Sequence, residues 1–244
     1  MSIVADDEIQ FRSDVTVELV RSAARDADVL FAARVSTLGE QSLDGAEEEA
    51  GARDQGLINY LMRDRHGSPF EHNSMTFYVQ APIFVFREFM RHRIASYNEE
   101  SGRYRELRPV FYIPAPERNL IQIGKTGHYE FIPGTPDQTE LVQAEARATS
   151  IAAYESYQRI LDSGVAREVA RIVLPLNIYS SMYVTMNARS LMNFLSLRTK
   201  REGTHFPSFP QREIELVAEQ MEALWAELMP FTYAAFNKNG RVAP

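Results

Sequence analysis

Residues 91–104 combine several side chains that could hold a phosphorylated ligand. The stretch begins with two arginines around a histidine and ends with a hydroxyl, a glycine and a third guanidinium: Arg91, His92, Arg93, Ser101, Gly102 and Arg103. A guanidinium can make paired hydrogen bonds to phosphate oxygens, and a glycine leaves the backbone accessible to the same anion. Cations that close a helix also complement its dipole, at about 0.3–1 kcal/mol each. The dipole explains one or two of these cations. The Ser-Gly-Arg turn therefore favours a phosphate site, with Glu99 beside it to balance charge or to bind a donor on the ligand.

A second group of polar residues lies downstream, where an expected strand gives way to a helix. Arg189 and Asn193 are one helical turn apart and would share a face, close to Asn187. Arg198 comes nine residues after Arg189, which at 3.6 residues per turn is about half a revolution. A straight helix would point the two arginines to opposite sides. They would then serve different parts of a large ligand or sites in different subunits, and an ordinary polar helix face is the alternative.

Missing residue types exclude several kinds of chemistry. The 244 residues include no cysteine, which excludes a thiolate nucleophile, a disulfide and any zinc or iron–sulfur centre ligated by cysteine. Residues 124–126 are Gly-Lys-Thr, the end of a P-loop, but Asn119 stands where that motif needs a glycine. No G-x-G-x-x-G pattern follows an expected strand, so a Rossmann dinucleotide site has no support.

The histidines and serines form no recognisable metal or hydrolase motif. His66, Glu71 and His72 lie close together, but their spacing matches no metal-binding pattern. Structural or hydrogen-bonding roles are the simpler interpretation. Neither Ser68 nor Ser101 lies in a G-x-S-x-G turn, so serine-hydrolase chemistry is not expected.

The elements that must position these groups occur in mixed order along the chain. Apolar patterning predicts strands over residues 15–20, 75–79 and 176–185. Apolar residues at helical spacing and helix start signals predict helices over residues 27–36, 47–65, 82–93, 137–164, 190–197 and 214–228. This order, without a repeat or a long linker, indicates an α+β fold: a single domain over residues 1–244, with a mixed or antiparallel sheet flanked by long helices.

Local signals refine the boundaries of these elements. Glu47, Glu48 and Glu49 should open one helix at its favourable end, and Asp137 should cap another. Residues 38–45 and 117–136 are polar and rich in turn-forming residues, so we expect loops there. Arg91, His92 and Arg93 should end the helix that begins near Pro82.

Charge and hydropathy limit the partners of the chain. The formal net charge of −7 disfavours bulk binding to nucleic acid or to an anionic membrane. Residues 1–14 lack the basic-then-apolar order of a signal peptide. The longest uninterrupted apolar run, residues 81–86, is far shorter than the ~20 residues of a membrane-spanning helix. We therefore expect a cytoplasmic protein.

The first cluster also resembles a known family. Arg91-His92-Arg93, followed after seven residues by Ser101, is similar to the R-H-R-x7-S signature of flavin-dependent thymidylate synthases. Further blocks resemble that family in the same order: residues 68–72 (SPFEH), 81–85 (APIFV), 171–175 (RIVLP) and 187–195 (NARSLMNFL). Together these blocks cover roughly residues 30–230, which makes coincidence very unlikely.

The resemblance implies a homotetramer whose active sites form at subunit interfaces and hold FAD and dUMP. Carried over by motif position, the residues that would contact FAD are Ser36, Ser68, Arg91, His92, Arg93, Glu99, Asn187, Arg189 and Asn193. Those that would contact dUMP are Glu88, Arg91, Glu99, Ser101, Gly102, Arg103, Arg171 and Arg198.

The resemblance also implies the reaction. The chain would convert dUMP, 5,10-methylenetetrahydrofolate and NADPH to dTMP, tetrahydrofolate and NADP, with non-covalent FAD as redox cofactor and no metal. Ser101, Arg103 and Arg171 would fix the phosphate. Arg198 would be the catalytic residue beside the uracil, where its charge favours electron density on the ring. No evident base activates Ser101, so its phosphate-binding role is preferred to a nucleophilic one.

A non-catalytic nucleotide or single-stranded nucleic acid binding protein is the alternative from another functional class. Aromatic residues that could stack bases are interleaved with the arginine-rich stretch: Tyr97, Tyr104, Phe111 and Tyr112. The net charge of −7 and the second group of Arg and Asn residues speak against this alternative.

Overall fold

The computed structural model describes residues 9–45, 50–51, 53–125 and 127–244, which form two compact units interleaved along the sequence. Unit 1 contains the described residues up to Val15, together with Gln80–Arg91 and Glu99–Met182. Unit 2 contains those of Thr16–Val79, His92–Asn98 and Tyr183–Pro244. The expected start of a helix at residues 47–49 lies outside the described residues.

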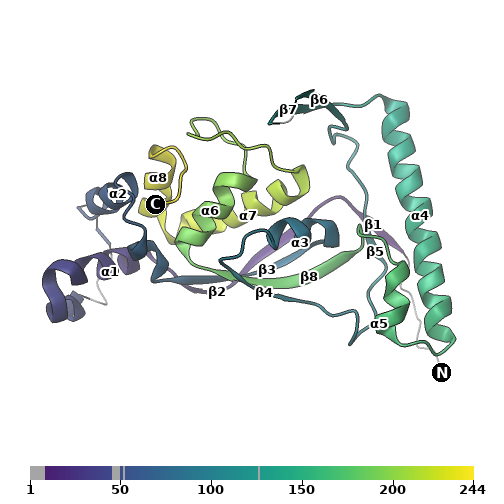
Figure 1. The fold of residues 1–244 in the computed structure, drawn as a ribbon, viewed down its shortest axis with the longest axis horizontal. Helices are drawn as coiled ribbons and strands as arrows, with labels where there is room; N and C mark the ends of the chain where they lie inside the picture. Colours follow the sequence, from purple (N-terminus) through teal and green to yellow (C-terminus); the bar gives the residue numbers. More distant parts are fainter. Residues whose placement is uncertain (1–8, 46–49, 52, 126) are drawn as a thin grey trace. The chain divides into compact units, whose positions relative to one another are not determined.

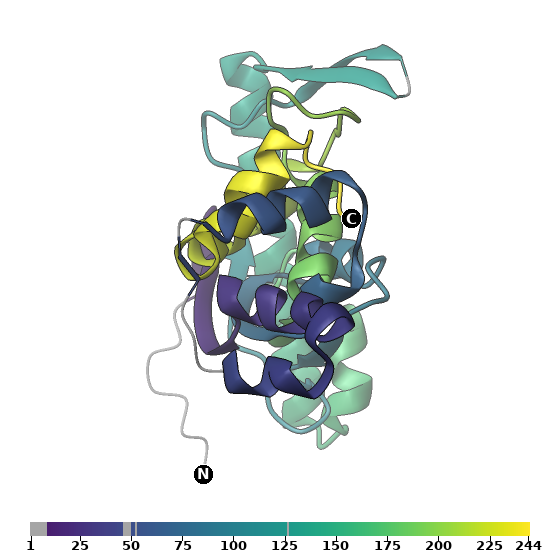
Figure 2. The same cartoon turned by 90° about the vertical axis from the view of Figure 1, so that its left-hand side faces the viewer.

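Helices make up most of unit 2. They are α1 (Asp26–Leu38), α2 (Gln55–Arg63), α6 (Ala188–Arg198), α7 (Arg212–Leu228) and α8 (Pro230–Lys238), with the short 3-10 helices η1 (Gly39–Gly45) and η2 (Ser68–Glu71). Helix α7 packs against α6, α8 and strand β2 (Thr16–Ala23), and Figure 1 shows α6 beside α7. The buried face of α7 carries the predicted apolar residues, among them Ile214, Met221 and Trp225. In the turned view of Figure 2, α2 lies against α1 and α8.

Unit 1 is built around α4 (Pro136–Asp162). Its other elements are α3 (Ile83–Phe89), α5 (Arg167–Ala170), η3 (Arg171–Val173) and the strands β1 (Gln10–Arg12), β5 (Val110–Tyr112), β6 (Ile121–Lys125) and β7 (His128–Ile132). Tyr154 and Tyr157 of α4 pack in one buried cluster with Phe111 and Ile178. Burial of these large rings anchors α4 to the unit.

The strands pair in both senses. One sheet has the order β2-β3-β8-β4, in which β3 (Ser74–Pro82), β4 (Ser96–Glu99) and β8 (Tyr179–Met186) contribute residues to both units. Strand β1 pairs with β5 in parallel, and β6 pairs with β7 antiparallel. Along β3 the predicted alternation is present, because Met75, Phe77 and Val79 are fully buried between partly exposed neighbours. The predicted α+β class is confirmed.

The helix predicted over residues 82–93 ends at Phe89. Pro82 is the N-cap and not the first helical residue that was predicted, and Met90 closes the helix. Arg91 then lies in a turn, and His92 and Arg93 follow in irregular backbone. The prediction that these residues end the helix is wrong. Because the dipole acts mainly within the last turn, it does not account for the cluster.

Both segments predicted as loops contain regular structure. Residues 39–45 form the 3-10 helix η1, and residues 117–136 include the hairpin of β6 and β7. Gly124 and Gly127 adopt φ values of 88° and 81°, which side-chain-bearing residues rarely tolerate. The glycines that suggested a loop therefore permit a hairpin.

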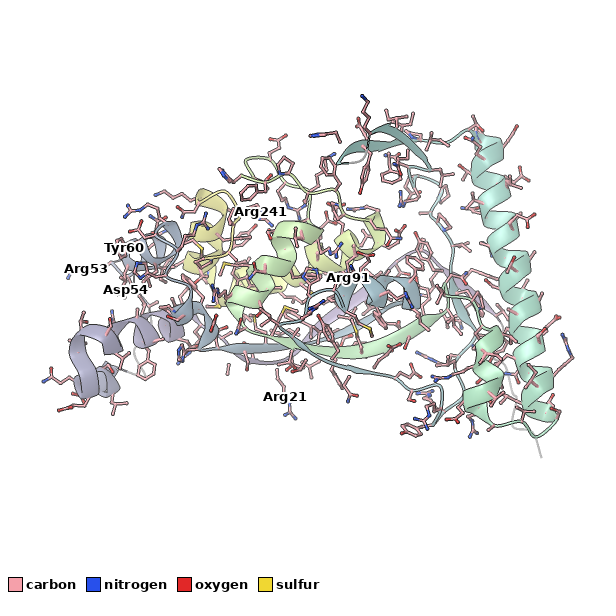
Figure 3. All side chains as sticks on the ribbon, in the orientation of Figure 1. Arg21, Arg53, Asp54, Tyr60, Arg91 and Arg241 are labelled. Carbon is pink, nitrogen blue, oxygen red and sulfur yellow. The ribbon has the colours of Figure 1, made fainter. Side chains whose placement is uncertain are left out.

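Two further predicted positions are wrong, and the helix predicted over residues 47–65 is shorter where the structure describes it. Within the described residues, α2 spans Gln55–Arg63, and Asp54, labelled in Figure 3, precedes it. Helix α4 is capped by Thr135 and not by Asp137: the Thr135 hydroxyl accepts from the backbone N–H of Gln138 at 3.3 Å, and the Gln138 side chain accepts from the N–H of Thr135 at 2.9 Å. Asp137 lies in the first turn, where its charge is favourable but does not cap. The strand predicted from residue 176 begins at Tyr179.

Candidate active site

The predicted phosphate-binding residues of unit 1 form a tight turn after β4. The carbonyl of Ser101 accepts from the backbone N–H groups of Tyr104 and Arg105 at 3.0 and 3.2 Å. Its Oγ accepts from the backbone N–H of Arg103 at 3.3 Å, which leaves the hydroxyl proton available to donate to a ligand. The turn therefore presents a hydroxyl and a guanidinium two residues apart, as the sequence predicted.

Gly102 brings this turn against Arg171. A Cβ atom on Gly102 would lie 3.3 Å from Cδ of Arg171 and 3.2 Å from Cδ1 of Leu107, closer than side chains usually pack. Gly102 is buried, whereas Arg171, the first residue of η3, is exposed. Two of the predicted substrate-binding residues, far apart in sequence, thus lie against each other, and a side chain at residue 102 would require Arg171 and Leu107 to shift slightly.

Glu99 completes this group at the end of β4. Burial raises the pKa of the Glu99 carboxyl and the neighbouring charge of Glu100 adds to the rise, whereas the Ser180 hydroxyl and the Arg171 guanidinium oppose it. The Arg171 guanidinium is thus one of the charges that act on the Glu99 carboxyl. A partly desolvated carboxylate beside an arginine is suited to accept a hydrogen bond from a polar ligand.

Arg103 is held at the surface by an acidic partner. Its Nε donates to Oε2 of Glu168 at 2.7 Å, and both side chains are 53% exposed. An ion pair with this exposure contributes about 0–1 kcal/mol, so an incoming phosphate could replace Glu168 at little cost. Glu88 and Arg91, the remaining predicted substrate residues of unit 1, lie in the last turn of α3 and just after that helix. Figure 3 labels Arg91.

Several of the predicted flavin residues of unit 2 lie on η2 or on the two helices that pack against it, α1 and α6. Ser68 is the first residue of η2, and Ser36 belongs to α1, where its hydroxyl donates to the carbonyl of Ala33 at 2.8 Å. Asn187 caps α6 by accepting from the backbone N–H of Ser190 at 2.9 Å. Asn193 donates to the carbonyl of Arg189 at 3.1 Å. Both asparagines therefore also have structural roles in α6.

Arg189 is held by residues that the sequence did not connect with it. Its Nε donates to the carbonyl of Pro244 at 2.6 Å, and its Nη1 pairs with Glu71. A Cβ on Gly67 would lie 2.6 Å from Nε of Arg189 and 2.7 Å from the oxygen of Pro244. Only a glycine permits this arrangement. Glu71 lies in one of the blocks that resemble the family (residues 68–72). Nothing in the sequence pattern indicated that Gly67 or Pro244 would contact Arg189.

Arg198 has a separate partner. Its Nε donates to Nε2 of His92 at 3.0 Å, and the imidazole edge packs on Phe194 with ring centroids 4.9 Å apart. Arg189 and Arg198 thus contact different groups of the protein although both lie on α6, and the ligands that they serve stay a prediction. Within the described part of the chain no cluster of three or more His, Asp or Glu side chains could hold a metal ion, and no helix is long and apolar enough to cross a membrane.

The donor set of unit 2 fits a flavin dinucleotide. A diphosphate needs cationic and hydroxyl donors, which Arg93, Arg189 and Ser68 supply from the segments around η2 and α6. The chain is thus an α+β protein whose exposed arginines and hydroxyls are of the types that phosphorylated ligands require.

Similarity to known proteins gives the family. Residues 18–231 match the family described as thymidylate synthase complementing protein. The chain is 67% identical over 244 residues to the flavin-dependent thymidylate synthase of Streptomyces coelicolor, with 99% of each chain covered, and 62% identical over 234 residues to that of Tropheryma whipplei, with 96% of this chain and 97% of the relative covered. The crystal structure of the UMP/dUMP methylase PolB from Streptomyces cacaoi, bound with 5-Br dUMP, has a TM-score of 0.91 at 57% identity and covers 97% of this chain and all (100%) of the other. The chain belongs to the family of flavin-dependent thymidylate synthases.

Proposed function

We propose that the protein methylates dUMP to dTMP, with 5,10-methylenetetrahydrofolate as carbon donor and NADPH as reductant. The observation that carries the proposal is the packing of Gly102 against Arg171, whose charge also acts on Glu99, in unit 1 of a chain that belongs to this family. When bound, FAD supplies the hydride-transfer chemistry that amino-acid side chains lack. The side chains bind, orient and polarise the substrate.

The turn of unit 1 is proposed to bind the phosphate of dUMP. Ser101 donates its hydroxyl, while Arg103 and Arg171 supply guanidinium groups. Arg103 exchanges its exposed partner Glu168 for the phosphate. Glu99, Glu88 and Arg91 would contact the rest of the nucleotide. Because the phosphate takes no part in the chemistry, Ser101, Arg103 and Arg171 would contribute binding and orientation of the nucleotide.

Arg198 is proposed to act on the uracil. Its fixed charge stabilises electron density that develops on the ring, so that C5 becomes nucleophilic toward the one-carbon unit. No cysteine is present to form a covalent adduct with the ring, so we assign activation to this charge together with the hydride chemistry that bound FAD supplies.

The flavin would be held by Ser36, Ser68, Arg91, His92, Arg93, Glu99, Asn187, Arg189 and Asn193. We propose further that the chain acts as one domain in a cytoplasmic homotetramer, in which active sites form at subunit interfaces. Support for this assembly comes from the family resemblance. We propose neither nucleic acid nor membrane as a partner, in keeping with the net charge of −7.

An anaerobic assay tests the proposal. The purified protein should be yellow, should lose its flavin absorbance when NADPH is added, and should form dTMP when dUMP and the folate donor are supplied. A colourless protein that takes up no FAD would defeat the flavin assignment. Steeply salt-dependent binding to oligonucleotides without flavin would instead favour the nucleic acid binding alternative.

UMP is a second candidate substrate. The relative PolB, at 57% identity, is described as a methylase of both UMP and dUMP. The two nucleotides differ only in the ribose 2′-hydroxyl, which a site rejects only if it cannot accommodate or pair that group. The same assay with UMP in place of dUMP distinguishes a strict thymidylate synthase from an enzyme that also methylates ribonucleotides.

A further inference from the structure

The hydrogen bond between His92 and Arg198 assigns a role to the histidine of the R-H-R motif. Arg198 is the last residue of α6, and its Nε donates to Nε2 of His92 at 3.0 Å. We propose that His92 is a positioning residue, which accepts this hydrogen bond and thereby sets the plane of the Arg198 guanidinium toward the substrate. The inference rests on the proposed function, because Arg198 is the residue placed beside the uracil there.

His92 is itself held firmly. Its ring meets Phe194 edge to face, with centroids 4.9 Å apart and an interplanar angle of 72°. Its carbonyl accepts from the hydroxyl of Tyr97 at 2.7 Å. Burial raises the pKa of Tyr97 to about 12, so this hydroxyl keeps its proton and remains a donor at neutral pH. Ring and backbone are fixed by separate contacts, as a positioning group requires.

The protonation state of His92 suits an acceptor. Burial, and after it the positive charge of Arg198, lower the pKa of the His92 imidazole to about 4. The ring is therefore neutral at pH 7, and because Nε2 accepts, its proton lies on Nδ1. A protonated imidazole would offer no lone pair to Arg198 and would repel it.

The backbone beneath Arg198 is fixed independently of His92. The next residue, Thr199, ends α6, and its hydroxyl accepts from Nη2 of Arg241 at 2.9 Å. Arg241 is in turn paired with Glu222 at 2.6 Å in the interior. With the main chain held in this way, rotation of the long Arg198 side chain is the remaining freedom. The bond at Nε restricts it because the guanidinium is planar.

The burial pattern of the R-H-R motif supports a division of labour. Arg91 and Arg93 are exposed, whereas His92 between them is partly buried. The histidine therefore does not share a surface with the two arginines. It is directed to α6 while its neighbours remain available to charged ligands.

Substitution of His92 tests the proposal through its hydrogen-bonding capacity. His92→Gln places an amide oxygen near the position of Nε2, whereas His92→Phe keeps the ring without an acceptor. We expect His92→Phe to weaken dUMP binding by about 10- to 100-fold, in keeping with loss of a hydrogen bond to a charged group, and to lower kcat to a similar extent. His92→Gln should stay within about threefold of the wild type. Because His92 is also one of the proposed flavin contacts, dUMP affinity and kcat are measured at saturating FAD, and His128→Phe on β7 is the control for a ring substitution elsewhere.

A double-mutant cycle shows whether His92 acts through Arg198. In an Arg198→Ala background, His92→Phe should cause no further loss of dUMP affinity, measured by calorimetric titration of the flavin-loaded protein. Additive losses would overturn the proposal. So would a His92→Phe enzyme that keeps wild-type dUMP affinity and kcat at saturating FAD, because His92 would then act on the flavin alone.

A third variant keeps the test decisive if His92→Phe does not fold. His92→Asn places its amide near the position of Nδ1 and should behave as a loss of the acceptor, whereas His92→Gln should rescue it. Equal behaviour of the Asn and Gln variants would contradict the proposal. A wild-type protein that binds dUMP but forms no dTMP would refute the proposed function. The double-mutant cycle on dUMP affinity would still test whether His92 acts through Arg198.

Discussion

The arginines of the two units are held in contrasting ways. In unit 1, Arg103 pairs with Glu168, and both side chains are 53% exposed. In unit 2, Arg241 pairs with Glu222, and their side chains are 4% and 5% exposed. Arg198 of unit 2 is bound to a neutral, partly buried histidine. Arg103 of unit 1 is thus presented to solvent, whereas Arg198 and Arg241 of unit 2 have internal partners.

This difference indicates how each set of residues works. An exposed ion pair is worth little, so it can be exchanged for a phosphate without loss of stability. A buried ion pair is costly to break, because one desolvated charge remains without its partner. Unit 1 is therefore suited to bind a ligand by exchange of partners. Unit 2 is suited to hold guanidinium groups in one arrangement before a ligand arrives.

The largest expected effect is on stability in unit 2. Glu222→Gln should lower the free energy of unfolding by about 3–5 kcal/mol, because Arg241 remains buried and Arg201 loses an acceptor 3.1 Å away. The matched substitution in unit 1, Glu168→Gln, should cost less than about 1 kcal/mol. Urea denaturation at one fixed protein concentration measures both. Equal effects would show that burial does not distinguish the two pairs.

Arg198→Lys should affect activity far more than cofactor binding. Lysine keeps the charge but has neither the Nε–H that donates to His92 nor the planar fork. We expect kcat to fall by about 10²-fold, the scale on which removal of a positioned transition-state donor acts, with FAD content within about twofold of the wild type. Steady-state kinetics and the flavin absorbance per protomer provide the measurement. Parallel loss of FAD and turnover would make Arg198 a structural residue.

Gly67→Ala should disturb Arg189 without introducing backbone strain. The φ of Gly67 is −76°, which any residue adopts, but a Cβ would collide with the Arg189 guanidinium and with the oxygen of Pro244. We expect FAD affinity to fall about tenfold and stability by about 1–3 kcal/mol. Gly56→Ala on α2 is the control, because a Cβ there meets nothing within 4 Å and should stabilise the helix slightly. Unchanged FAD affinity in Gly67→Ala would remove Arg189 from the flavin site.

Sequence patterns predicted the parts of the molecule that depend on local order. The buried faces of β3 and α7 followed from their periodicity, and the Ser101–Arg103 turn followed from residue types. The contacts of Arg189 with Gly67 and Pro244 join segments far apart in the chain, so no local pattern could reveal them. Residue types also could not identify the N-cap of α4, because Thr135 and Asp137 are both good capping residues. Only the backbone geometry shows that Thr135 is the cap.

The smallest expected effect concerns Glu99 of unit 1, whose exposure lies between the two extremes. Its carboxyl has a pKa raised above the ordinary value of 4.5, chiefly by burial. The folded protein therefore binds a proton at Glu99 more readily than the unfolded chain does. The contribution of Glu99 to the free energy of unfolding therefore falls as the pH rises from about 4.5 through the raised pKa. Above the raised pKa the destabilisation is complete and no longer changes with pH.

Glu99→Gln removes the destabilisation that a partly buried, ionised carboxylate causes. The same substitution should weaken dUMP binding, since a charged acceptor for the ligand is lost. At pH 7 the ligand-free variant should be more stable than the wild type, by less than about 1 kcal/mol because Glu99 is only partly buried, or up to about 4 °C in Tm. The difference in Tm should grow between pH 4.5 and the raised pKa and then remain constant. A difference that shrinks with rising pH would mean that Arg171 outweighs burial at this site, and unit 1 would then share the prearranged character of unit 2.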